Sequence, residues 1–195
     1  GFDLQHLEFA DQLAGEMIEK FGDERGGFFQ TLADQRDLLV RQKESYDGAV
    51  PSGNSLAVLA LVRLAMLTGN DEFRKIADRA FAVSAHAVES NPRGYHYLIN
   101  AYAFATSQPD EVALVGRLSD PDLKALLTRV HARFRPNLVL ALLDPGAGNQ
   151  AEIQQRVPLL AERGQLDGRA TAYVCHNFAC KLPVSDPDAL ELQLQ

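Results

Sequence analysis

The stretch SLAVLALVRLAMLTG, residues 55–69, decides the fold of the first half of the chain. It is apolar on nearly every side of a helical projection, and Arg63 is its only charged residue. Such a helix has no polar face to turn toward water, so we expect it to be buried on all sides. Gly69 follows it, and glycine commonly ends a helix in the left-handed conformation.

Amphipathic segments alternate with apolar ones on either side of this stretch. Residues 4–21 and 71–89 carry apolar side chains at helical spacing with charged residues between them. Residues 94–107, GYHYLINAYAFATS, are again apolar on most faces. A simple helical bundle would predict amphipathic helices throughout, whereas an α/α toroid buries its inner helices and half-exposes its outer ones. The alternation therefore favours a toroid.

Two short strands are predicted between the first two helices. GGFFQT (residues 26–31) and DLLVRQKES (residues 37–45) are rich in strand-forming residues and are separated by a polar turn. We therefore expect a β-hairpin near residues 26–45.

The pattern changes after SQPD, residues 107–110. EVALVG (111–116) and NLVLALL (137–143) predict strands, and the residues between them predict an amphipathic helix capped by Asp120. Such a unit has parallel strands and a right-handed crossover, and TAYVC (171–175) predicts a third strand. The expected fold is of the α + α/β class.

Two domains are therefore expected. Residues 1–108 would form a partial α/α toroid. Residues 109–195 would form a small three-stranded α/β unit. The opening residues, GFDLQHLEF, contain no initiator Met and no apolar leader, so we expect the chain to begin within a longer protein.

The composition of the chain argues against some classes of binding partner and indicates its compartment. The net charge is −7 and the pI is about 5.2, which argues against a nucleic-acid or anionic-membrane surface. No apolar run reaches the roughly 18 residues of a transmembrane helix. Two cysteines are too few for a disulfide scaffold, so a soluble protein of the reducing cytoplasm is expected.

Three long stretches together resemble one family. They are GGFFQT with LLVRQKE (38–44), YDGAVPSGNSLAVLALVRLAMLTG (46–69) and DGRATAYVCHNFACKLPVSDP (167–187). They resemble the spermatogenesis-associated protein 20-like family, which also has bacterial members. The resemblance implies an upstream thioredoxin-like domain followed by an α/α toroid of the six-hairpin glycosidase-like type, and this chain would be roughly the last third of such a protein. It implies no particular reaction, because a shared fold does not fix function, so whether the chain is an enzyme stays open.

The loop of residues 43–55 holds a cluster of polar side chains. Glu44 or Asp47 could act as a general acid or base if burial raised its pKa. A carbohydrate-like ligand could be held by hydroxyl-binding groups and an aromatic face. The candidate ligand-binding residues are Tyr46, Ser52, Asn54, Tyr95 and His96.

A purely structural interpretation of these residues competes with the functional one. Ser52 or Asn54 would then cap the helix that follows, and Asp47 would accept backbone N–H groups. Tyr95 and His96 would be satisfied residues of the helical core.

Cys175 and Cys180 are the second candidate site. Their spacing suits one edge of a zinc site, but a closed site needs about four ligands, so we expect no metal, and we expect no cofactor. A disulfide requires the backbone to fold back between them. The pair is either a set of buried inert thiols or a redox pair. The thioredoxin-like domain implied by the resemblance could exchange with it.

Two functional hypotheses follow from these sites. In the first, the protein binds or processes a carbohydrate-like small molecule through Asp47 and its loop. In the second, the chain is a non-catalytic interaction or redox-partner module that works with the upstream thioredoxin-like domain. A partial toroid would also expose apolar surface, so self-association is expected.

Overall fold

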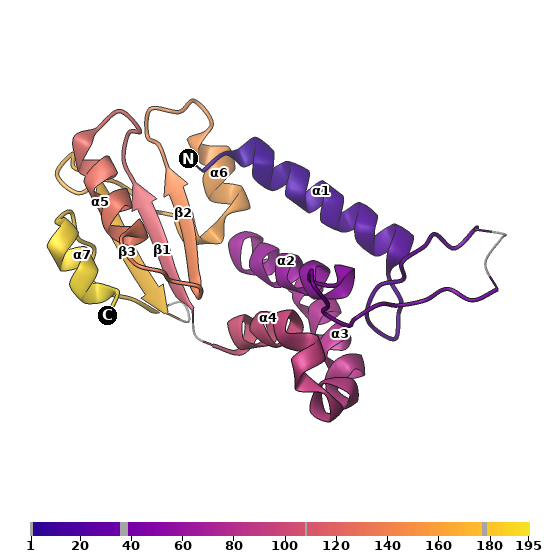
Figure 1. The fold of residues 1–195 in the computed structure, drawn as a ribbon. Helices are drawn as coiled ribbons and strands as arrows, with labels where there is room; N and C mark the ends of the chain where they lie inside the picture. Colours follow the sequence, from indigo (N-terminus) through magenta and orange to yellow (C-terminus); the bar gives the residue numbers. More distant parts are fainter. Residues whose placement is uncertain (1, 36–38, 108, 177–178) are drawn as a thin grey trace. The chain divides into compact units, whose positions relative to one another are not determined.

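The computed structural model describes residues 2–35, 39–107, 109–176 and 179–195 (Figure 1). The chain divides into two compact units, each with its own core. One is Gln5–Thr106, and the other is Ser107–Gln195 together with Gly1–Leu4. The division lies beside the predicted boundary after residue 108.

The first unit is helical. Its elements are α1 (Leu4–Phe21), α2 (Gly53–Thr68), α3 (Asp71–Ser90), the short 3-10 helix η1 (Pro92–Tyr95) and α4 (His96–Thr106). α2 packs against both α3 and α4. Its Val58, Leu61 and Val62 are fully buried, and each such side chain contributes about 1.5–3 kcal/mol. α2 ends at Gly69, whose φ of 70° is left-handed as predicted.

The apolar helices are less buried than their sequences predict. On α2, Leu56, Ala60 and Arg63 form an exposed stripe, because α3 and α4 cover only part of its circumference. On α4, Tyr102 is 54% exposed. The expectation of burial on all sides is therefore wrong for the described part of the chain.

The predicted β-hairpin near residues 26–45 is also wrong, although residues 36–38 lie outside the described residues. Its described parts contain a single isolated bridge, from Phe28 to Gly22, and no regular strand. One backbone hydrogen bond, from Gln30 N to Gln42 O at 2.9 Å, joins its two arms. Side chains supply the remaining support, since Arg41 donates to the Thr31 carbonyl and stacks on Phe29. The described parts of the two arms thus form a loop.

The second unit is a mixed α/β structure. Its elements are β1 (Asp110–Val115), α5 (Pro121–His131), β2 (Leu138–Leu143), α6 (Gln150–Arg156), the 3-10 helix η2 (Pro158–Leu160), β3 (Thr171–His176), β4 (Ala179–Cys180) and α7 (Pro187–Gln193). The sheet order is β2-β1-β3-β4. β1 and β2 are parallel and joined through α5, as predicted. Asp120 occupies the N-cap position of α5 without a side-chain capping bond.

The third strand differs from a simple parallel extension of this unit. β3 runs antiparallel to β1, because it begins at Thr171 opposite Val115, where β1 ends. A short fourth strand, β4, then pairs with β3. The three-stranded sheet that we expected is therefore a four-stranded mixed sheet among the described residues.

Strand alternation gives this sheet two buried faces. Val112, Leu114 and Val174 point to the side that α5 and α7 cover, where they form one apolar core with Leu123 and Leu190. Ala113, Tyr173 and Cys175 point to the opposite side, which the α6–η2 segment covers. The cysteine site thus lies on the α6–η2 side.

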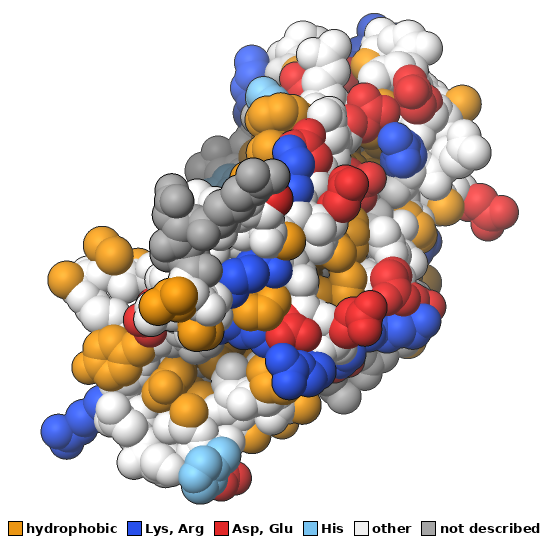
Figure 2. Space-filling view, turned by 90° about the vertical axis from the view of Figure 1, so that its right-hand side faces the viewer, with side chains coloured by type: hydrophobic (Ala, Val, Ile, Leu, Met, Phe, Trp, Pro, Cys, Tyr) orange, Lys and Arg blue, Asp and Glu red, His pale blue; other side chains and the backbone are white. Residues whose placement is uncertain are grey.

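Charges of both signs are mixed on one face of the molecule. Among the described residues on the face shown in Figure 2, Lys and Arg side chains alternate with Asp and Glu. No helix in the described ranges is long and apolar enough to cross a membrane.

Candidate functional site

Asp47 is a buried carboxylate that joins three segments of the helical unit. It is 3% exposed, and its Oδ1 accepts a hydrogen bond from Ser52 N at 2.9 Å. Its Oδ2 accepts from Tyr97 N at 2.8 Å and from Leu98 N at 3.2 Å, at the start of α4. Since the N-terminus of a helix carries unpaired N–H groups and partial positive charge, Asp47 serves as a remote cap for α4.

The pKa of Asp47 fits this structural role. Burial raises it, but hydrogen bonds from Ser52, Ser55, Leu98 and Tyr97 outweigh burial and hold the pKa below its ordinary value. A general acid needs a raised pKa, so the condition that we set for acid catalysis by Asp47 is not met. Glu44 lies on the surface, where its Oε1 accepts from Tyr46 N at 2.7 Å. The catalytic assignment stays a prediction that this geometry does not favour.

Of the two predicted capping residues, Ser52 and Asn54, only Ser52 caps α2. Ser52 is the N-cap of α2, and its Oγ accepts from Ser55 N, as predicted. Asn54 does not cap the helix. Its side chain pairs with both backbone groups of Phe28, at 2.7 and 2.9 Å, and donates to the Glu44 carbonyl at 2.8 Å. Asn54 thus fastens both arms of the loop to α2.

Only part of the predicted ligand site comes together. Tyr46 and Tyr95 form an edge-to-face pair with ring centroids 6.2 Å apart, and Tyr46 is 54% exposed. His96 is exposed and lies 3.4 Å from the Arg93 carbonyl. The hydroxyl-binding groups of the buried Ser52, Asn54 and Asp47 are occupied by internal hydrogen bonds. An aromatic surface therefore remains, but few polar groups are left for a sugar.

An apolar groove lies elsewhere on the helical unit, between α3 and α4. It has a volume of about 460 Å³. Phe81 and Tyr102 contact each other there edge to face, with centroids 5.2 Å apart. Asp78 and Glu89 are the charged residues of its lining. The groove does not include the residues that sequence analysis selected for a ligand.

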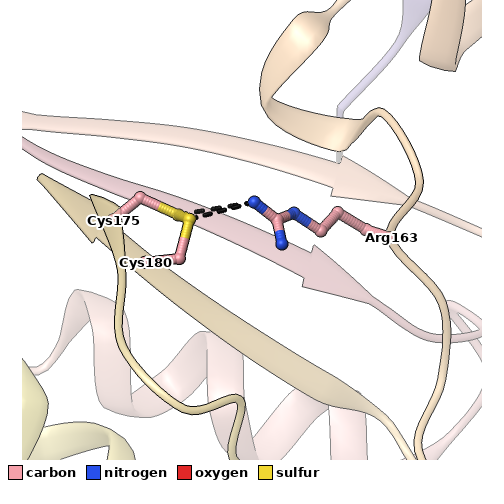
Figure 3. Close-up of a disulfide and its surroundings, with 3 residues drawn as sticks. All are labelled: Arg163, Cys175 and Cys180. Atoms are coloured by element: carbon pink, nitrogen blue, oxygen red, sulfur yellow. Dashed lines mark hydrogen bonds between the residues drawn. A yellow bond between two sulfur atoms is a disulfide. The ribbon is translucent and has the colours of Figure 1, made fainter. Parts of the chain in front are cut away.

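Cys175 and Cys180 are joined in a disulfide (Figure 3). They lie directly opposite each other in the β3–β4 pair, so the chain does fold back between them. Cys175 is 1% exposed, whereas Cys180 lies at the surface. The interpretation of both residues as buried inert thiols is therefore wrong. One sulfur of the bridge is shielded and the other belongs to an exposed residue.

Arg163 points at this bridge from the loop that follows η2 (Figure 3). Its Nη2 lies 2.9 Å from the Sγ of Cys180 and 3.8 Å from the Sγ of Cys175. The guanidinium also stacks on the Tyr173 ring, 4.8 Å from its centroid. The Tyr173 hydroxyl in turn donates to the Gly164 carbonyl at 2.7 Å, which fixes the segment that carries Arg163. A held cation thus faces both sulfurs.

A carboxyl group flanks Cys175 on the neighbouring strand β1, across β3 from Cys180. Glu111 of β1 is the direct cross-strand partner of Cys175 in β3, so both side chains project from the same face. Burial raises the pKa of Glu111 above its ordinary value, and the nearby His176 offsets part of this rise. His176 itself pairs with Asp110 at 3.0 Å.

Sequence analysis did not select Arg163 or Glu111. Arg163 lies in a polar segment whose form the sequence does not predict. Glu111 belongs to a predicted strand, but its proximity to Cys175 depends on the antiparallel register of β3. No group of three or more His, Cys, Asp or Glu residues in the described ranges could hold a metal ion.

The class that these observations define is a helical unit followed by a mixed α/β unit that carries a disulfide between a buried and an exposed cysteine. No protein-family model matches the chain. The chain is homologous to spermatogenesis-associated protein 20 of Homo sapiens, with 30% identity over 183 residues, and the same identity holds for the protein of Rattus norvegicus. An uncharacterized protein of Caenorhabditis elegans is 24% identical over 188 residues.

This homology supports the family that the sequence motifs predicted. The alignment with the human protein covers 93% of this chain and 23% of the relative. For the nematode protein the shares are 96% and 25%. The chain therefore spans about a quarter of the length of the curated relatives it matches.

Proposed function

We propose that the chain is a thiol–disulfide exchange module in which Cys175 and Cys180 cycle between a disulfide and a dithiol. The observation that carries the proposal is the Arg163 guanidinium, which lies 2.9 Å from the Sγ of the exposed residue Cys180 and 3.8 Å from the Sγ of the buried residue Cys175. A neighbouring cation favours the thiolate, which is both the leaving group and the nucleophile of exchange.

The order of the steps follows from the exposure of the two cysteines, because Cys180 lies at the surface and Cys175 is buried. A thiolate of a partner dithiol attacks the Sγ of Cys180, and the disulfide electron pair leaves on the Sγ of Cys175. The partner's second thiol then attacks the mixed disulfide and releases the Cys180 thiolate beside Arg163. Two electrons and two protons pass to this chain, and the partner becomes a disulfide. The dithiol is the only co-reactant, so no cofactor is required.

The competing explanation is that the disulfide only stabilises the fold. The short loop that the disulfide closes argues against this explanation. The two cysteines are five residues apart in sequence. Closing so short a loop stabilises a fold by about 2 kcal/mol in the chain-entropy model, less than a long-range bridge contributes. Strand pairing already holds β4 beside β3.

The partner that we propose is the upstream thioredoxin-like domain implied by the family resemblance. A dithiol domain in the same protein would meet this disulfide at high effective concentration. A cytoplasmic setting suits the proposal, since disulfides there are usually transient and catalytic or redox-sensing. The helical unit would complete a toroid with further segments of the longer protein. Carbohydrate binding at the 43–55 loop is the weaker alternative, because its polar groups serve the fold.

The test is the rate at which dithiothreitol reduces the disulfide, followed by alkylation and mass spectrometry. We expect Arg163→Gln to slow reduction about tenfold at neutral pH, the effect of losing one charge-assisted hydrogen bond of about 1.5 kcal/mol. Arg163→Lys should retain part of the rate. Arg169→Gln is the matched control, because Arg169 lies in the same unit and pairs with Asp122 on the surface. Equal rates for Arg163→Gln and the unaltered chain would overturn the proposal.

A further inference from the structure

The buried sulfur of the disulfide needs a proton whenever the bridge is reduced. Attack at the exposed Cys180 leaves negative charge on Cys175, which is 1% exposed. An uncompensated charge in such a place is costly, because burial disfavours the ionised form. Arg163 lies 3.8 Å from that sulfur and offsets part of the charge, but an arginine does not give up its proton.

We propose that Glu111 is the proton-transfer group for Cys175, an inference that rests on the proposed exchange function. Glu111 lies directly opposite Cys175 in the β1–β3 ladder, and directly opposed side chains have Cβ atoms about 4.5–5.5 Å apart. A carboxyl group at that range reaches a sulfur directly or through one water molecule.

The surroundings keep Glu111 suited to this role. It is half-buried, and burial holds its pKa above the ordinary carboxyl value. His176, which is paired with Asp110, is the neighbour that opposes this rise. On its other flank, β2 presents Val139. The covering α6 carries Glu152 and Arg156 on its exposed surface, and Arg163 faces the two sulfurs.

The step balances as a proton relay. During reduction the S–S bond breaks and Cys175 takes the electron pair as a thiolate. The Glu111 carboxyl then passes its proton to that sulfur and becomes a carboxylate. During oxidation the direction reverses: the Glu111 carboxylate removes the proton from Cys175 as its sulfur attacks the mixed disulfide on Cys180. A group whose pKa lies nearer to neutrality than that of an ordinary carboxylic acid suits both directions.

The experiment measures reduction by dithiothreitol as a function of pH in the unaltered chain and in Glu111→Gln. Glutamine keeps the shape but carries no transferable acid proton. We expect Glu111→Gln to slow reduction at least about tenfold, and to remove an inflection from the pH profile of the rate. Glu111→Asp should restore part of the rate and the inflection. Glu152→Gln, an exposed carboxylate of the same unit, is the control and should leave the rate unchanged.

The outcomes separate this inference from the function on which it rests. If dithiothreitol does not reduce the unaltered chain, or if Arg163→Gln has no effect, the exchange function fails and the Glu111 role fails with it. If Arg163→Gln slows reduction while Glu111→Gln keeps both the rate and the pH profile, only the Glu111 role is overturned. Circular dichroism of each oxidised variant establishes that the fold is intact before rates are compared.

Discussion

At the scale of single residues, the polar groups of this chain divide into two kinds. Asp47, Ser52 and Asn54 are buried and satisfied, and their hydrogen bonds hold loops onto helix ends. Arg163 and Glu111 are placed beside two sulfurs whose chemistry changes with oxidation state. The first kind explains the local fold, and the second kind supports the proposed thiol–disulfide exchange.

Asp47→Asn tests the structural role of the buried carboxylate. We expect a loss of about 2–4 kcal/mol in unfolding free energy, because the amide nitrogen cannot accept the hydrogen bonds that a carboxylate oxygen accepts from backbone N–H groups. Urea unfolding measures this loss. Glu44→Gln, on an exposed carboxylate of the same loop, should change stability by less than about 0.5 kcal/mol.

The pH dependence gives Asp47 a second signature. Because its folded pKa lies below the ordinary value of 3.8, its contribution to stability is present above that value and is lost as the pH falls through the folded pKa. Asp47→Asn should therefore flatten this acid limb of the stability curve. An unchanged acid limb would show that the carboxylate is not a stabilising acceptor.

At the scale of elements, hydrophobic periodicity predicted α2, α3, α4, α5, β1 and β2 well, because each has a regular pattern within itself. Strand propensity wrongly predicted a β-hairpin at residues 26–45, because the described parts of this stretch do not pair as regular strands. It could not give the antiparallel direction of β3, which depends on how α6 and η2 return the chain to the end of β1. Arg163 and Glu111 were missed for this reason, because their proximity to the cysteines depends on the path of this segment and on the register of β3.

α2 offers an internal comparison of buried and exposed leucines. Leu61 is fully buried and Leu56 is 47% exposed. We expect Leu61→Ala to cost about 3 kcal/mol, because it removes a packed side chain and leaves a cavity. Leu56→Ala should cost less than about 1 kcal/mol in the chain described here. Equal losses, measured by urea unfolding, would show that Leu56 is covered in solution, for example by self-association.

At the scale of the whole molecule, the chain combines a helical unit whose loop polar groups serve structure with an α/β unit that carries the Cys175–Cys180 disulfide. Its curated relatives are about four times longer. The exchange partner that we propose is the thioredoxin-like domain that the family resemblance implies. The net charge of −7 and the mixed surface charges in Figure 2 fit a protein partner better than nucleic acid.

The most direct test of the exchange function is the reduction potential of the Cys175–Cys180 pair, measured by equilibration in glutathione buffers and alkylation of free thiols. Stabilising disulfides of secreted proteins typically lie below about −300 mV, whereas exposed disulfides with favoured thiolates lie higher. We predict a potential above that value, which becomes more negative in Arg163→Gln as the reduced form loses its cation. A potential below about −300 mV that is unaffected by Arg163→Gln would contradict the account and assign the bridge to structure alone.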